Sequence, residues 1–184
     1  MPSLLALHCS DDPAAWAALG LPERIGEVEV RFVAGEGGLV GWTLAGDGPA
    51  GIDGIPTAWE SGVPVERSAV ALDHVVVFTD DVGRTTAALV DAGGDKRRRA
   101  APPDVPVPMA FVKLGDTVVD VAQGGGQPRL WGVTVVVDDL DALDPALVGT
   151  PRDAIQPGRR IVTVRPEAGL RTAVAFMTPR VRTR

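Results

Sequence analysis

Three stretches of the chain share one pattern of apolar and polar positions. In each, a largely β-branched apolar run leads to two aspartates, and a short Ala- and Leu-rich stretch then ends at a glycine. The stretches are residues 3–20, 71–94 and 130–149. The aspartate pairs are Asp11 and Asp12, Asp80 and Asp81, and Asp138 and Asp139, and the glycines are Gly20, Gly93 and Gly149. Each apolar run predicts a strand, and each stretch after it predicts a helix that the glycine ends.

Each helix is followed by a second recurring pattern. Residues 27–45, 109–122 and 160–177 each contain two alternating apolar runs separated by a glycine-containing turn, which predicts further strands. Strand, helix and further strands in this order form a βαβββ module, and the order occurs three times. The chain is therefore expected to be built from three such units.

The run from Leu72 to Val77 resembles the opening strand of the vicinal oxygen chelate superfamily, the glyoxalase, bleomycin-resistance and dioxygenase-like proteins. The resemblance implies an α+β fold in which two βαβββ modules, about 71–123 and 129–179, form an incomplete barrel. In that family the concave side binds a small molecule, often through a divalent metal. Residues 69–184 would then form the glyoxalase-like domain, and residues 1–68 an extra, degenerate N-terminal module with a linker.

Composition narrows the classes of partner. The chain has 184 residues, 45% apolar content and a formal net charge of −6, which fits a globular protein and argues against nucleic acid as a partner. Its apolar runs are all far shorter than the roughly 20 residues that span a bilayer, and the first residues lack a secretory signal, so a cytoplasmic location is expected. The single cysteine excludes an intramolecular disulfide and a multi-thiolate zinc site.

The aspartate pairs have a structural explanation. An aspartate just before a helix accepts hydrogen bonds from the free N–H groups of the first turn, so helix capping is the expected role. Residues 46–51 spell the dinucleotide-binding pattern G-x-G-x-x-G, but no helix is expected after it, so we assign no cofactor there. The Gly- and Pro-rich residues 46–68 are expected to form a hinge or crossing arm.

The resemblance also identifies the positions of metal ligands, one on the first strand of each module and one, usually a glutamate, on the last. His74 lies six residues before Asp80, and its equivalents are Leu5 and Gly132. On the last strands, Asp120 stands at the glutamate position, whereas the other modules offer residues 41–43 and 175–177, neither of which can bind a hard cation well. Only His74 and Asp120 remain as weak candidate ligands. We therefore expect no cofactor and no complete metal site, with a bound divalent metal as the alternative.

Strand alternation predicts where a ligand would lie. It places His74, Val76 and Phe78 on one face of their strand, and Val118 and Asp120 on one face of theirs. Both ionisable groups could therefore face one concavity, where the pair would orient a ligand or hold the imidazole in one tautomer. In the alternative interpretation, His74 is a buried residue with one satisfied hydrogen bond, and the aromatic residues on the predicted strands pack in the hydrophobic core. The expected pocket is lined by His74, Phe78, Phe111, Val118, Asp120, Trp131, Thr134 and Phe176.

Two function classes follow. One is a glyoxalase-like protein that binds a small molecule without a complete metal site. The other is an enzyme of the superfamily, a lyase, epimerase, isomerase or dioxygenase that uses His74 and Asp120. A homodimer is a further possibility, because an odd number of modules leaves one strand edge unpaired.

Overall fold

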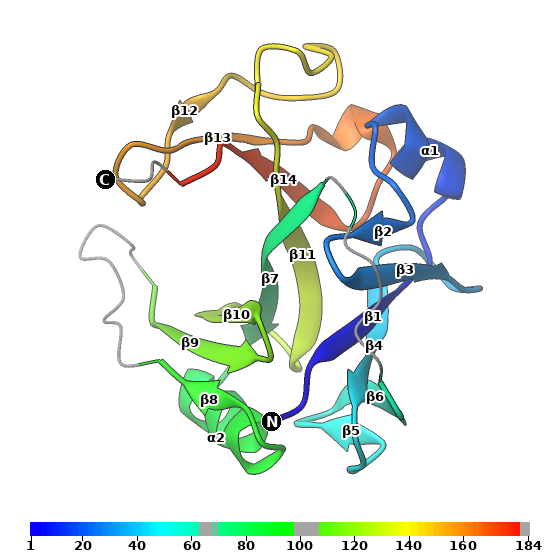
Figure 1. Cartoon of the computed structure of the whole chain (residues 1–184), viewed down its shortest axis with the longest axis vertical. Helices are drawn as coiled ribbons and strands as arrows, with labels where there is room; N and C mark the ends of the chain where they lie inside the picture. The colour runs from blue at the N-terminus through cyan, green and yellow to red at the C-terminus, as the bar shows by residue number, and fades with distance from the viewer. Residues whose placement is uncertain (63–67, 69, 98–106, 181–184) are drawn as a thin grey trace.

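The structure is a computed structural model that describes residues 1–62, 68, 70–97 and 107–180. Within these residues the chain forms two mixed β-sheets that face each other (Figure 1). The N-terminal sheet has the strand order β2-β3-β1-β4-β6-β5, and the C-terminal sheet has the order β12-β13-β14-β11-β7-β10-β9-β8. The expected boundary at residues 68/69 stays a prediction, because residues 63–67 and 69 lie outside the described part.

The N-terminal sheet is built from short elements. They are β1 (Leu4–Cys9), α1 (Pro13–Ala18), β2 (Arg24–Ile25), β3 (Val28–Phe32), β4 (Leu39–Ala45), β5 (Gly51–Ile52) and β6 (Ile55–Glu60). The two strands expected within residues 27–45 are present, but they are not neighbours, because β1 lies between them, parallel to β3 and antiparallel to β4. β4 in turn runs parallel to β6. The prediction that residues 41–43 lie on the last strand of a single module is therefore wrong, and the expected hinge contains two strands.

The C-terminal sheet contains both modules that the sequence predicts. The first comprises β7 (Ala71–Thr79), α2 (Val82–Asp91), β8 (Asp95–Lys96), β9 (Met109–Leu114) and β10 (Thr117–Gln123). The second comprises β11 (Arg129–Val136), β12 (Arg152–Asp153), β13 (Arg160–Thr163), the 3-10 helix η1 (Pro166–Ala168) and β14 (Ala173–Met177). In each module the first strand pairs in parallel with the last, and the two first strands, β7 and β11, pair antiparallel at the centre.

Aspartates cap both α-helices. The Asp12 side chain accepts a hydrogen bond from the Ala14 amide at the start of α1, and Asp81 accepts one from the Arg84 amide at the start of α2. The capping prediction is confirmed for these two of the three aspartate pairs. The helix expected within residues 138–149 is absent, and this segment is a series of turns. Pro145 disfavours a helical Asp144, and the Asp144 carboxylate instead accepts a hydrogen bond from the Ala146 amide.

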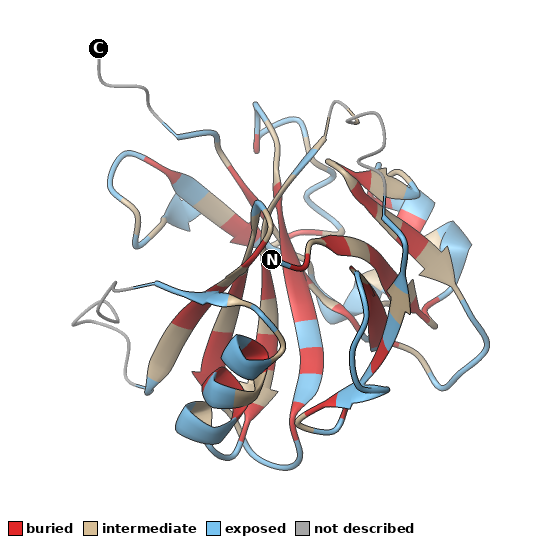
Figure 2. Ribbon diagram, turned by 60° about the horizontal axis from the view of Figure 1, so that its bottom comes forward, coloured by how far each residue is buried: buried red, intermediate tan, exposed pale blue. Residues whose placement is uncertain are grey.

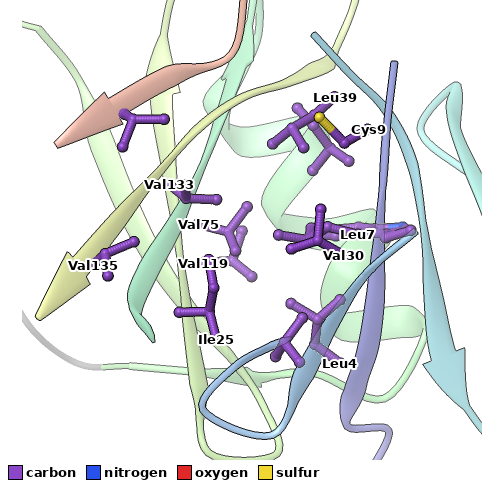
Figure 3. Close-up of a cluster of buried hydrophobic side chains, with 14 of the residues drawn as sticks. Leu4, Leu7, Cys9, Ile25, Val30, Leu39, Val75, Val119, Val133 and Val135 are labelled. Carbon is purple, nitrogen blue, oxygen red and sulfur yellow. The ribbon is translucent and has the colours of Figure 1, made fainter. Parts of the chain in front are cut away.

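The hydrophobic core lies between the two sheets. Leu7, Val30 and Leu39 of the N-terminal sheet point toward Val75 and Val133 of the C-terminal sheet (Figure 3). Along the central strands, buried positions alternate with less buried ones (Figure 2), so each strand contributes every second side chain to this core. Helix α2 packs against β9 and β10 and buries Leu89 in the same core.

A buried carboxylate connects the two halves of the molecule. Asp11 is 6% exposed and accepts hydrogen bonds from the backbone amides of Gly38 (2.8 Å), Arg171 (2.8 Å) and Thr172 (3.0 Å). Burial by itself raises the pKa of Asp11, but these hydrogen bonds outweigh burial and lower the pKa below its ordinary value. Asp11 therefore joins the loop before β4 to the segment before β14.

None of the helices in the described ranges is both long enough and apolar enough to cross a membrane.

Candidate functional site

His74 lies at the centre of the face of the C-terminal sheet that is turned away from the core. Its neighbours in the sheet are Val118 on β10 and Thr134 on β11. Val76, two residues further along β7, lies beside Asp120 and Gly132. The alternation predicted from the sequence is therefore correct, and His74 and Asp120 share this face, which we call the His74 face.

A β-bulge brings a second carboxylate to His74. Thr134 lies opposite His74 and the next residue, Val135, lies opposite Leu72, so Asp73 is the extra residue in β7. Its Oδ2 atom is 2.9 Å from Nδ1 of His74, and its Oδ1 atom is 2.7 Å from Nη1 of Arg159. The Asp73 and Arg159 side chains are only 8% and 2% exposed. Asp73 and Arg159 thus form a buried ion pair behind the imidazole.

The charge state of Asp73 follows from these contacts. Burial alone raises the pKa of Asp73, but the hydrogen bonds from His74 and Arg159 lower it to about 2. Asp73 is therefore ionised at neutral pH and can only accept hydrogen bonds.

The other imidazole nitrogen faces the interior of the site. Nε2 of His74 is 3.0 Å from Oγ1 of Thr134 and 3.7 Å from Oδ2 of Asp120. The sequence suggested Asp120 as the carboxylate that could fix the imidazole. The structure instead gives this contact to Asp73, because 3.7 Å exceeds hydrogen-bond length.

Two hollows adjoin at the contact between His74 and Thr134. The polar hollow, with a volume of about 270 Å³, is lined by Asp73, His74, Arg97, Phe111, Lys113, Asp116, Val118, Asp120, Gln156 and Arg180. The apolar hollow, of about 200 Å³, is lined by Val76, Trp131, Val133, Thr134, Thr163, Val164, Ala173, Val174 and Ala175. One side of the His74 face is therefore charged and the other is apolar.

An aromatic pair borders the apolar hollow. Trp131 lies at a second register shift, between Leu130 and Gly132, and it is 42% exposed. Its ring stacks on Phe78 at a centroid distance of 4.3 Å and an interplanar angle of 19°. The guanidinium carbon of Arg129 lies 5.7 Å from the Phe78 ring centroid. The pair presents an exposed, flat aromatic surface.

The structure brings most of the expected pocket residues together. His74, Phe111, Val118 and Asp120 line the polar hollow, Trp131 and Thr134 line the apolar one, and Phe78 stacks on Trp131. Phe176 is the exception. It pairs with Val135 on the opposite side of the sheet and is 1% exposed in the core, so its expected place in the pocket is wrong.

Sequence reasoning missed Asp73 and Arg159. Strict alternation would turn Asp73 away from His74 and into the core, where an unpaired carboxylate is costly. The sequence did contain one indication of the bulge, because alternation places the charged Asp73 at a position that should be apolar and buried. Arg159 lies in a loop and gave no comparable signal.

The donor set does not fit a metal centre of the kind that the family resemblance implies. Both imidazole nitrogens of His74 already contact protein oxygens, on Asp73 and Thr134. Gly132 and Ala175, on the His74 face of the second module, carry no ligand atoms in their side chains. Among the described residues, no three His, Cys, Asp or Glu side chains form a group that could hold a metal ion.

The N-terminal sheet contains a similar pair. Nε2 of His8 on β1 is 2.8 Å from Oγ1 of Thr43 on β4, so a His–Thr contact joins the central antiparallel strands of both sheets. Here Arg31 lies beside the pair and forms salt bridges with Glu29 and Glu60. Burial, with a smaller contribution from the Arg31 charge, lowers the pKa of His8.

Comparison with known proteins finds similarity in structure only. No protein-family model matches the sequence, and no curated protein matches it significantly. A glyoxalase I variant from Zea mays superposes with a TM-score of 0.50 at 16% identity, over 100% of this chain and 69% of that one. A hypothetical protein from Bacillus halodurans gives 0.50 at 10% identity, over 64% of this chain and 99% of that one.

Methylmalonyl-CoA epimerase from Mycobacterium tuberculosis superposes with a TM-score of 0.49 at 17% identity, covering 59% of this chain and 87% of the epimerase. At these identities the likeness concerns the fold and not the activity. The likeness to glyoxalase I extends over the N-terminal sheet as well as the C-terminal one. Together with the paired modules around β7 and β11, it shows that this chain has the α+β, incomplete-barrel fold of the vicinal oxygen chelate superfamily.

Proposed function

We propose that this glyoxalase-like chain binds a small organic molecule on the His74 face, without a complete metal site. The observation that carries the proposal is that a polar and an apolar hollow adjoin at the contact between His74 and Thr134. Small-molecule sites are typically concave and largely apolar, with a few polar groups that fix orientation. The His74 face has this composition.

The two hollows suggest the chemistry of the ligand. The stacked Trp131 would receive a flat ring, because such contacts contribute about 0.5–1.5 kcal/mol beyond the buried area. Lys113 and Arg97 at the polar hollow offer hydrogen-bond donors. Nε2 of His74 offers an acceptor when a donor on the ligand takes the place of the Thr134 hydroxyl. The ligand class is therefore a planar molecule with polar substituents on one side.

A fragment screen tests this proposal. Binding would be detected as a rise in thermal midpoint and as a change in tryptophan fluorescence. Trp131 is the natural reporter, because it is 42% exposed and borders the apolar hollow, whereas Trp16 and Trp42 are 1% and 0% exposed. The fourth tryptophan, Trp59, is partly exposed but lies on β6 in the other sheet. A hit should lose at least about tenfold in affinity, or about 1.4 kcal/mol, in His74→Ala and in Trp131→Ala.

His8→Ala is the matched control, because it removes the chain's other imidazole, which contacts a threonine in the N-terminal sheet, and should leave affinity unchanged. Hits that bind His74→Ala and Trp131→Ala as tightly as the parent chain would place the ligand elsewhere. A silent screen, with both variants less stable, would mean that these residues only support the sheet.

A second candidate function is proton transfer in an enzyme of this fold. The specific observation in its favour is the 2.9 Å contact between Asp73 and Nδ1 of His74, the arrangement that orients a general base. A bound hit with an acidic C–H group would then exchange that hydrogen for deuterium in D₂O. Exchange should be lost in His74→Ala, whereas exchange at an equal rate in that variant would refute the enzymatic role.

A further inference from the structure

The two His–Thr pairs of this chain differ in one respect. In both, Nε2 of a histidine contacts Oγ1 of a threonine across the central antiparallel strands, at 2.8 Å for His8 and 3.0 Å for His74. Only His74 has a described carboxylate contact at Nδ1, from the bulged Asp73. The two contacts differ in register, because His74 lies directly opposite Thr134, whereas His8 lies opposite Gly41 and reaches Thr43 diagonally. The carboxylate is specific to the His74 face.

The hydrogen bond to Asp73 determines which nitrogen of the His74 imidazole carries the proton. An ionised Asp73 can only accept, so the nitrogen that faces it must carry the hydrogen. In the neutral imidazole Nε2 is consequently bare, and the Thr134 hydroxyl donates to it. At His8 the described contacts include no carboxylate that fixes the tautomer. Arg31 donates to Oγ1 of Thr43 at 3.3 Å, and the hydroxyl can still either donate to Nε2 of His8 or accept from it.

Arg159 determines how the Asp73 carboxylate is oriented. Its Nε atom donates to the Thr178 carbonyl oxygen at 2.7 Å, and its Nη1 atom donates to Oδ1 of Asp73. With Oδ1 engaged by a buried guanidinium, only Oδ2 is directed at the imidazole. The bulge, the aspartate and the arginine therefore act on His74 as one unit.

We propose that Asp73 and Arg159 are positioning residues that hold His74 in its Nδ1–H tautomer. When the Thr134 hydroxyl rotates away from Nε2, this nitrogen accepts a hydrogen bond or a proton from the bound molecule. The ligand class is a molecule with an acidic O–H, N–H or C–H group next to its flat part. On proton uptake Nδ1–H remains bonded to Asp73, the proton from the ligand resides on Nε2, and Asp120 balances the charge of the imidazolium. This inference rests on the proposed binding function of the His74 face.

Imidazole ¹⁵N NMR of the ligand-free protein tests the tautomer without any substitution. The chain has two histidines, so the spectrum contains two ring systems, and His8→Ala assigns them. At a pH where both rings are neutral, His74 should show a protonated Nδ1 and a bare Nε2. A protonated Nε2 at His74, or equal populations of the two tautomers, would overturn the proposal.

Asp73→Asn provides the stronger test. Arg159 still needs an acceptor, so the amide oxygen should face Arg159 and the amide NH₂ group should face Nδ1, which must then accept. His74 should switch to the Nε2–H tautomer while the His8 signals stay unchanged. Asp120→Asn is the matched control and should preserve the Nδ1–H form. Unchanged His74 signals in a folded Asp73→Asn protein would refute the positioning role.

The affinities of the parent chain and of Asp73→Asn for a screening hit distinguish a failure of the positioning role from a failure of the proposed binding function, on which this inference rests. A screening hit should bind Asp73→Asn at least tenfold more weakly, because the Nε2–H group of His74 would then face the donor group of the ligand. If the tautomer switches but no fragment binds the parent chain, the proposed function fails and the positioning role stands. If fragments bind both proteins equally well, the proposed function stands and the positioning role in binding fails.

Discussion

Replacement of Asp11 by alanine tests how the two sheets are held together. The substitution leaves three backbone N–H groups, those of Gly38, Arg171 and Thr172, without their carboxylate acceptor. A buried donor without a partner costs about 1–3 kcal/mol. Water can reach part of the site once the carboxylate is gone, so the low end applies, and the expected loss is about 3 kcal/mol in the free energy of unfolding.

Urea denaturation followed by far-UV circular dichroism measures this loss. With a slope of about 2 kcal/mol per molar urea, the midpoint should fall by about 1.5 M. The neighbouring Asp12→Ala is the matched control, because Asp12 only caps α1 from an exposed position and should cost about 1 kcal/mol. If Asp11→Ala costs no more than Asp12→Ala, then the Asp11 carboxylate does not hold the sheets together.

Three further predictions concern the His74 face and the residues that support it. The lowered pKa of Asp73, about 2 against about 4 when unfolded, means that its contribution to stability is complete above pH 4 and is lost as the pH falls toward 2. In Arg159→Met the free energy of unfolding should therefore fall less steeply than in the parent chain as the pH is lowered from 4 toward 2. An identical pH dependence in the two proteins would contradict the contacts assigned to Asp73. Nickel, zinc, manganese and iron should leave the thermal midpoint almost unchanged, and a saturable rise that His74→Ala abolishes would establish a metal site after all. Gly132→Ala should cost about 1–3 kcal/mol, because the added methyl group would overlap the Ala173 carbonyl oxygen; an equally stable variant would show that β11 and β14 can separate.

Much of the C-terminal sheet could be predicted from the sequence, because its strands alternate regularly between one buried and one open face. The runs 71–79, 109–123 and 129–136 contain enough β-branched residues for both period and strand type to be clear. The segment 138–149 was predicted wrongly because its Ala and Leu content resembles that of a helix. Pro145 and the turn-forming aspartates outweigh that composition.

The N-terminal sheet was harder to predict because pairing is not local. Residues 28–32 and 39–45 look like a hairpin, but β1 inserts between them, and only tertiary packing determines that order. The candidate site shows the same limitation. Alternation placed His74 with Asp120 correctly, but it could not place Asp73, because one bulge reverses the direction of a side chain.

A fragment titration followed on the two histidine ring signals tests the central claim most directly. His74 lies on the proposed binding face, and His8 occupies the similar position in the other sheet, so each ring reports on one sheet. Binding fragments should shift the His74 ring signals saturably and leave the His8 signals in place. Saturable shifts at His8 alone, or binding that moves neither ring, would contradict a ligand site on the His74 face.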